Sequence, residues 1–129
     1  MQEPPPPQEQ PLLSAPTEPQ LAAAADTFAL LASPARLHLV WLLSTGRHDV
    51  GELAAEVGLS LPTTSQHLSK LRLAGMVSAR KEGRHSYYTV EDPHVMAFVQ
   101  QAFEHIAPDG SLAPDPPLAA PTVGKESQA

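Results

Sequence analysis

The placement of proline constrains this chain more than any other feature of its sequence. Seven of the 15 prolines lie between Pro4 and Pro19, and five more lie between Pro108 and Pro121. Proline fixes φ and has no amide hydrogen, so dense proline interrupts helices and sheets alike. We therefore expect residues 1–19 and 108–129 to be disordered proline-rich tails, and residues 20–107 to form one folded domain.

The three remaining prolines mark helix starts. Pro34 and Pro93 follow Ser33 and Asp92 directly, and Pro62 comes two positions after a serine. Proline is favoured in the first helical turn, and a serine or aspartate before it caps the free amides. Together with the spacing of apolar residues, these signals predict helices over residues 18–31, 34–44, 51–57, 62–74 and 93–106.

Two other segments have different patterns. Residues 77–81 and 85–90 are short, rich in Val, Tyr and Thr, and joined across Glu82-Gly83-Arg84, which predicts a β-hairpin. The two short helices before it, separated at Gly58, are typical of a helix-turn-helix. The expected fold is mainly α with a β-hairpin wing (α+β), in the order ααααββα.

Several classes of protein are excluded or disfavoured by composition. The chain has no cysteine, which excludes disulfides, thiolate metal sites and cysteine nucleophiles. It has no apolar run long enough to span a bilayer and no signal-peptide pattern, so we expect a cytoplasmic location. We do not expect an enzyme, because phosphate-binding glycine loops, nucleophile motifs and convergent acid pairs are all missing.

The charge distribution is more informative than the net charge of -6. Residues 60–90 contain five Lys or Arg side chains against the single acid Glu82, a local charge of +4. When such a basic stripe stands alone, it is more often a solvated face than a nucleic-acid surface. The pattern of the helix beside it decides between these interpretations.

The helix predicted over 62–74 has an apolar side and a polar side. Short hydroxyls and a glutamine on the polar side permit close approach to base edges, and a lysine can contact phosphate. The hairpin tip adds cations that would meet the DNA backbone or minor groove. The candidate DNA-binding residues are Thr63, Ser65, Gln66, His67, Ser69, Lys70, Arg80, Lys81 and Arg84.

Two stretches of sequence resemble a known family. These are LASPARLHLVWLL from Leu31 and DVGELAAEVGLSLPTTSQHLSKLRLAGMVSARKEGRHSYYTV from Asp49. They are similar to the ArsR/SmtB family of metal-sensing winged helix-turn-helix repressors, and the similarity extends from about Leu21 to His105. It implies a homodimer, packed through its first and last helices, that sits on operator DNA and leaves when an effector binds.

The resemblance also implies a metal site. Asp92, His94 and His105 follow the spacing of the last-helix site in zinc, cobalt and nickel sensors of this family. The two histidines lie roughly 16 Å apart along a helix, so only an antiparallel pair of chains could close the site. The family's fourth ligand falls on Pro108, and Asp109 or water would have to replace it. Nitrogen and carboxylate donors suit Zn²⁺, or Co²⁺ and Ni²⁺ with further ligands.

Other interpretations remain open at this point. Asp92 is already explained as a helix cap, and the two histidines as polar residues of an interface. The chain can therefore be a repressor of the same family with a different effector or none. It can also be a winged-helix protein-interaction module that uses its tails. Among the other histidines, we expect His38 in the core, and His48, His67 and His85 facing solvent or DNA.

Overall fold

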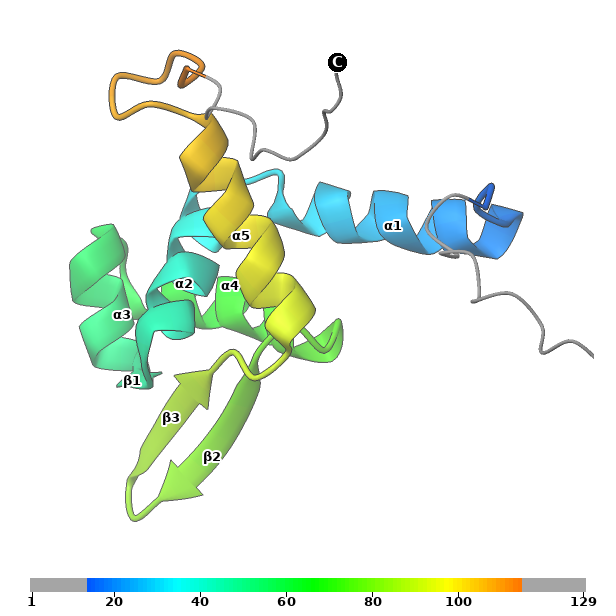
Figure 1. Cartoon of the computed structure of the whole chain (residues 1–129). Coiled ribbons are helices and arrows are strands. Elements are labelled where there is room, and N and C mark those ends of the chain that lie inside the picture. The colour runs from blue at the N-terminus through cyan, green and yellow to red at the C-terminus, as the bar shows by residue number, and fades with distance from the viewer. Residues whose placement is uncertain (1–13, 115–129) are drawn as a thin grey trace, which may run out of the picture.

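The computed structural model describes residues 14–114, which form five helices and a small antiparallel sheet (Figure 1). Of the expected tails 1–19 and 108–129, residues 1–13 and 115–129 lie outside the described residues. The helices are α1 (Glu18–Leu31), α2 (Pro34–Thr45), α3 (Val50–Val57), α4 (Leu61–Leu73) and α5 (Pro93–His105). The strands are β1 (His48–Asp49), β2 (Ser78–Glu82) and β3 (His85–Thr89). The predicted helical domain with a β-hairpin is confirmed.

The helices begin where the sequence predicts. Ser33, Ser60 and Asp92 each accept a hydrogen bond from a backbone amide in the first turn of α2, α4 and α5. Each of these helices carries its proline in that turn. The proline has no amide hydrogen to satisfy there, and the cap satisfies one of the others.

Strand β1 corrects the predicted element order. His48 and Asp49 pair antiparallel with Tyr88 and Tyr87, giving the sheet order β1-β3-β2. Two residues are too few to produce the alternating pattern of a strand, so the sequence shows no sign of β1. This short strand joins the hairpin to the start of α3.

The core is centred on α2. Side chains from α2 to α5 meet there with at most 2% of their surface exposed: Leu39, Val40, Leu43, Leu53, Leu68, Leu71 and Val99. The prediction that His38 belongs to this core is wrong, because His38 is exposed. Trp41 also stays 43% exposed on the same side of α2. That side faces an open groove beside α5, described below.

Helix α1 projects from the rest of the domain (Figure 1). Only Leu31 at its end is buried, while Leu21 and Phe28 are 56% and 62% exposed. Phe28 lies near Phe98 of α5, with ring centroids 6.1 Å apart. Within residues 14–114 no single helix is long and apolar enough to cross a membrane; α1 and α2 pass that test only as a pair bent by 95°.

The chain turns back after α5. Ile106 and Leu112 form an antiparallel bridge, and the amide of Ala113 donates to the carbonyl of His105 at 2.9 Å. Residues 108–114, the described part of the expected tail from residue 108, lie in this turn. The described chain therefore ends beside the last residue of α5.

Thr64 is a polar residue in the apolar core. It is fully buried in α4, and its hydroxyl has no hydrogen-bond partner among the described residues. Since a buried hydroxyl without a partner loses its hydration, we expect Thr64→Val to raise the free energy of unfolding by about 1 kcal/mol. Chemical denaturation would measure this. Thr63→Val is the contrasting control, because the exposed Thr63 hydroxyl accepts from the hydroxyl of Ser60 at 3.0 Å and its loss should not raise the stability. A lower stability of Thr64→Val would show that the hydroxyl is hydrogen-bonded in solution.

Candidate nucleic-acid interface

Helices α3 and α4 form the helix-turn-helix. The side chains and backbone amides of Asp49 and Glu52 bond reciprocally at the start of α3. The helix ends at Gly58, whose φ of 72° is a left-handed conformation that favours glycine. Ser60 then caps α4. The turn is therefore built from local capping chemistry, and it fixes the direction of α4.

Helix α4 presents one polar side to solvent. Leu68 and Leu71 are fully buried on its other side. The candidate residues on the solvent side are all exposed: Thr63, Ser65, Gln66, Ser69 and Lys70. Leu73 is also 87% exposed at the end of the helix, and nothing in the structure explains it. The first turn carries no acidic side chain, so the positive end of the helix dipole is open to an anion.

His67 occupies a half-buried position on the flank of α4. Its Nδ1 lies 3.3 Å from a terminal guanidinium nitrogen of Arg36, whose Nε donates to the carbonyl of Leu30 at 2.6 Å. Because a guanidinium can only donate, this contact favours the neutral imidazole with its proton on Nε2, so that Nδ1 can accept. Burial, and then the charges of Arg36 and Lys70, lower the pKa of His67. Sequence reasoning missed Arg36, which lies on α2, outside the basic stretch.

The lowered pKa of His67 predicts how the stability of the protein changes with pH. In the folded state the pKa of His67 lies below its ordinary value of 6.5. As the pH falls through 6.5, His67 therefore binds fewer protons in the folded state than in the unfolded state. The free energy of unfolding should therefore decrease as the pH falls through this range. We expect His67→Gln to lose less stability than the wild type between pH 7.5 and 5.5 in urea denaturation. Equal losses would contradict this.

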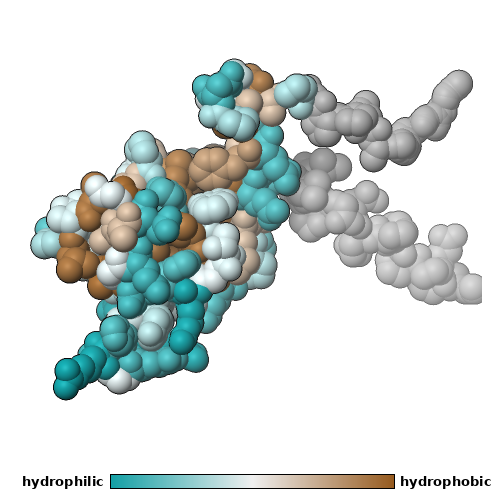
Figure 2. Space-filling view, turned by 90° about the vertical axis from the view of Figure 1, so that its left-hand side faces the viewer, coloured by the Kyte–Doolittle hydropathy of each residue, from teal (hydrophilic) through white to brown (hydrophobic). Residues whose placement is uncertain are grey.

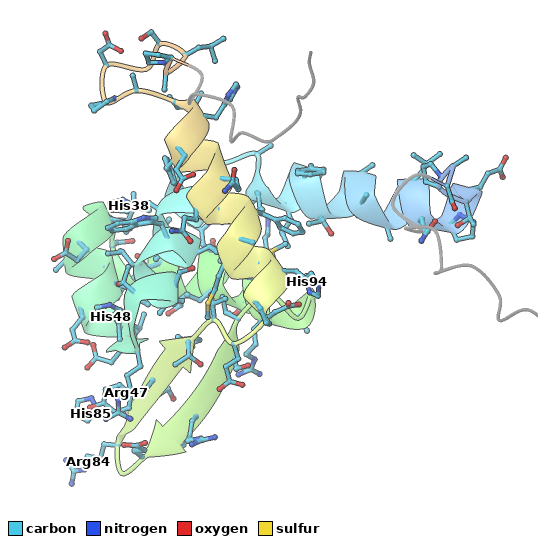
Figure 3. All side chains as sticks on the ribbon, viewed as in Figure 1. His38, Arg47, His48, Arg84, His85 and His94 are labelled. Carbon is cyan, nitrogen blue, oxygen red and sulfur yellow. The ribbon has the colours of Figure 1, made fainter. Side chains whose placement is uncertain are left out.

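The hairpin of β2 and β3 forms the wing. Its tip includes Gly83, with φ of 64°, and Arg84 points away from the helices (Figure 3). Arg80, Lys81 and Arg84 are all exposed, and within residues 14–114 none of them is in an ion pair. These cations are therefore available to a polyanion.

Arg47 supports the wing from outside the hairpin. Its guanidinium lies 2.7 Å from a carboxylate oxygen of Glu82 and 4.0 Å from the centroid of the Tyr87 ring. It therefore pairs with the one acid of the hairpin and makes a cation–π contact with β3. Sequence reasoning missed Arg47 because it precedes α3 and gives no local signal of its partners.

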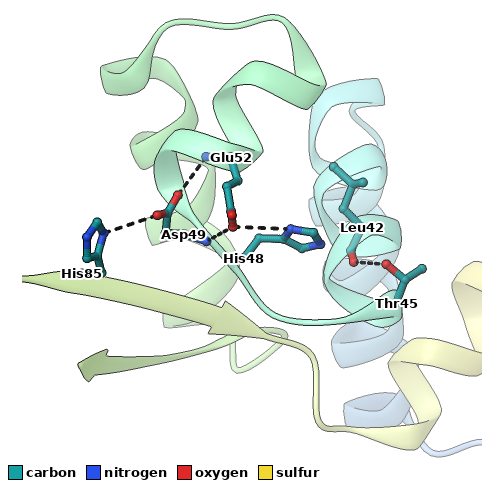
Figure 4. A network of polar contacts seen from close by, with 6 residues as sticks. All are labelled: Leu42, Thr45, His48, Asp49, Glu52 and His85. Atoms are coloured by element: carbon teal, nitrogen blue, oxygen red, sulfur yellow. Dashed lines mark hydrogen bonds and ion pairs between the residues drawn. The ribbon is translucent and has the colours of Figure 1, made fainter. Parts of the chain in front are cut away.

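A polar network joins the wing to the helix-turn-helix (Figure 4). Nδ1 of His85 lies 3.3 Å from one oxygen of Asp49, whose other oxygen accepts from the amide of Glu52 at 2.8 Å. Nδ1 of His48 lies 3.7 Å from the carboxylate of Glu52. The wing thus contacts the residues that cap α3, and these contacts link the hairpin to the helix-turn-helix.

The predicted metal ligands lie at the two ends of α5. Asp92 caps the helix: one carboxylate oxygen accepts from the amide of His94 at 2.8 Å and lies 3.0 Å from its Nδ1. The amide hydrogen bond is the largest cause that lowers the pKa of Asp92. His105 is the last residue of the helix. Within residues 14–114, one chain brings Asp92 and His94 together, but it assembles no group of three metal ligands.

Asp109, the doubtful fourth ligand, is engaged in the turn after α5. Its carboxylate accepts from the hydroxyl of Ser111 at 2.6 Å and from its amide at 3.0 Å. These bonds lower the pKa of Asp109, the hydroxyl bond being the larger cause. To bind a metal, the carboxylate would have to share or leave these partners.

Comparison with known proteins decides the family. Residues 33–79 match the sequence pattern of the family described as "Bacterial regulatory protein, arsR family". The HTH-type transcriptional regulator KmtR of Mycobacterium tuberculosis is 37% identical over 92 residues, which cover 69% of this chain and 71% of KmtR. The chain belongs to the arsR family. This arsR-family protein is a DNA-binding transcriptional regulator, and the resemblance in its sequence is confirmed.

Two further matches bear on its fold and its function. The arsR-family chain is 39% identical to the probable mercury resistance operon repressor of Streptomyces lividans, over 68% of this chain and 70% of that one. It is 28% identical to the homodimeric winged helix-turn-helix DNA-binding domain of Mycobacterium bovis, with a TM-score of 0.61. That match covers 70% of this chain and 86% of the other. The predicted winged helix-turn-helix is confirmed.

Proposed function

We propose that this chain is a homodimeric transcriptional repressor that binds operator DNA through α4 and the wing. The single observation that carries this proposal is the exposed polar and basic character of the two elements. The polar side of α4 is exposed, and the wing that follows it in the chain holds three exposed cations without ion-pair partners in the described residues. A bacterial repressor of this kind acts in the cytoplasm, where the DNA is.

The side chains of α4 suit the major groove. Gln66 can pair with the two hydrogen-bonding groups of adenine, while Thr63, Ser65 and Ser69 are short enough to let the backbone approach. Lys70 supplies a phosphate contact. His67 stands beside them and donates through Nε2, the nitrogen that Arg36 leaves free.

The wing suits the backbone or minor groove beside α4. Arg80, Lys81 and Arg84 contribute charge and no base-specific pattern, so their contacts position the protein on the duplex. Arg47 is a positioning residue, since it contacts both Glu82 and Tyr87 of the hairpin. Together the two elements account for both the sequence preference and the electrostatic affinity of a repressor.

The homodimer is proposed from the apolar surface of α1 and α5. A helix of 14 residues with one buried residue is marginal in water unless it packs on something else. Phe28 and Phe98 already face each other within the chain, and both remain exposed. A twofold pairing of α1 and α5 would cover these rings, and it would place two α4 helices about one turn of DNA apart.

We propose as effector a divalent metal ion, Zn²⁺ or alternatively Co²⁺ or Ni²⁺. The ligands would be Asp92 and His94 of one chain and His105 of its partner. Imidazole and carboxylate donors suit these ions, and Asp92 and His94 already lie 3.0 Å apart with exposed side chains. The ion would link the start of one α5 to the end of the other. A dimer held in a geometry unsuited to DNA would then lose affinity for its operator.

The first experiment is a titration of operator DNA with metal-free protein at fixed salt, repeated with each ion. We expect zinc to weaken DNA binding by roughly 5- to 150-fold in the wild type, the usual range of allosteric coupling. His105→Ala should bind the same DNA equally well and be insensitive to zinc. His38→Ala is the matched control, because it removes an exposed histidine outside the proposed site. Release of His105→Ala by zinc would exclude His105 from the mechanism.

A second candidate is a repressor of the same family whose effector is not a metal. The bonds from Ser111 to Asp109 favour it, because they occupy the fourth donor beside Pro108. This candidate predicts tight operator binding that is unchanged by all three ions. The DNA titration distinguishes the two candidates.

A further inference from the structure

An apolar groove lies between α2 and α5. Its main cavity, of about 580 Å³, is lined by Pro34, Leu37, His38, Trp41 and Phe103. A second hollow, of about 230 Å³, shares Trp41 and extends to Met96 and Gln100. We call the two together the α2–α5 groove. Figure 2 shows apolar side chains gathered on this side of the molecule, away from the hydrophilic hairpin.

The main cavity of the groove opens on a different side of α5 from the surface proposed for the dimer. The hollow beside α1 is lined by Phe28, Phe98 and Ala102; it shares Leu37 with the main cavity and Val99 with the second hollow. Phe98 and Phe103 are five positions apart, which turns them about 140° from each other around α5. One helix therefore presents rings to two separate surfaces.

The groove leaves large rings uncovered within residues 14–114. Trp41 is 43% exposed and Phe103 is 47% exposed, and His38 is exposed between them and Pro34. Contiguous apolar surface of this kind is typical of a binding site. The main cavity supplies flat faces of aromatic and proline rings, with the indole N–H of Trp41 and the ring of His38 as its polar groups. The second hollow adds the polar side chains of Ser44, Thr45 and Gln100.

We propose that residues 115–121 of this same chain dock in the α2–α5 groove as a polyproline II segment. This stretch contains Pro116, Pro117, Leu118 and Pro121. Polyproline II has no internal hydrogen bonds, so its carbonyls are free to accept from Trp41 and His38. Aromatic-lined grooves bind such segments because the conformation is already formed and little entropy is lost on docking.

The turn after α5 brings the start of this segment next to the end of α5, the helix that lines one side of the groove. The bond from Ala113 to the carbonyl of His105 returns the chain to within two positions of Phe103. Seven residues of polyproline II span roughly 20 Å at about 3.1 Å each. The distance from Phe103 back to Met96 along α5 is only about 10 Å. A tether this short gives an effective concentration on the order of millimolar, so weak intrinsic affinity is sufficient.

Trp41 makes the proposal measurable, because it is the only tryptophan of the chain. The full chain is compared with a P116S/P117S/L118S variant by acrylamide quenching of tryptophan fluorescence. If the segment covers the half-exposed indole, the quenching constant should rise about twofold in the variant, with a red shift in emission. A P5S/P6S/P7S variant, which alters the other proline-rich segment equally, should match the wild type. Added peptide of residues 114–122 at millimolar concentration should restore shielding to the first variant.

Two outcomes would overturn the proposal. Equal quenching in the wild type and P116S/P117S/L118S would show that the segment does not cover Trp41. Shielding that increases with protein concentration, and is the same in both proteins, would assign the groove to a second copy of the chain. The proposal does not depend on the effector of the repressor, since it is tested in the absence of metal and DNA.

Discussion

Replacement of Lys81 and Arg84 by alanine should weaken operator binding roughly ten- to hundredfold at 0.15 M salt. Both side chains are exposed at the end of the wing, with no ion-pair partner in residues 14–114. Each phosphate contact releases counterions, so losing two contacts should also make the plot of log K against log salt shallower by about two. Fluorescence anisotropy of labelled operator at several salt concentrations would measure both effects.

The control for this double variant is A23E/K125A, which changes the net charge by the same amount elsewhere. Ala23 is exposed on α1, and Lys125 lies outside the described residues. If the control loses as much affinity and slope as K81A/R84A, the effect comes from net charge, and the wing makes no specific contact. If neither variant changes the slope, the wing does not meet DNA.

The sequence predicts the fold well where the chemistry is local. A proline after a serine or aspartate cap defines the start of a helix within a few residues, so Ser33, Ser60 and Asp92 mark α2, α4 and α5 correctly. Gly58 and Gly83 mark turns whose positive φ favours glycine. The two sides of α4 follow from the helical repeat alone.

Contacts between residues that are far apart in the chain could not be predicted from the sequence. Arg36 and Arg47 reach His67 and Glu82, which are 31 and 35 positions away, and neither has a recognisable local pattern. His38 has the spacing of a core residue on α2, yet the side of α2 that carries it borders the α2–α5 groove. Strand β1 exists only because β3 pairs with it. Tertiary contacts determine all of these features.

The candidate metal ligands depend on a contact beyond the single chain. The spacing of Asp92, His94 and His105 requires two copies, and the structure of one chain assembles only the first two. The single chain does show an exposed apolar surface on α1 and α5 that a partner chain would cover. The proposed dimer is therefore the feature on which both the proposed mode of DNA binding and the proposed effector site depend.

Leu21→Glu should dissociate the proposed dimer while leaving each chain folded. Leu21 is 56% exposed, on the same side of α1 as Phe28, and is absent from the core. Covering the exposed part of this side chain in both copies would contribute about 2–4 kcal/mol, so the dissociation constant of the dimer should rise roughly 30- to 1,000-fold. Sedimentation equilibrium would measure that constant, and affinity for a two-half-site operator should fall with it.

Ala23→Glu is the matched control for this experiment. It introduces the same charge on the same exposed helix, but two positions from Leu21 and so about 200° around α1. We expect Ala23→Glu to remain dimeric and to bind DNA like the wild type, because its side chain points away from the proposed partner. A dimer that is equally stable in both variants would show that α1 is not part of the interface. Two-chain closure of the Asp92, His94 and His105 site would then have to come from α5 alone.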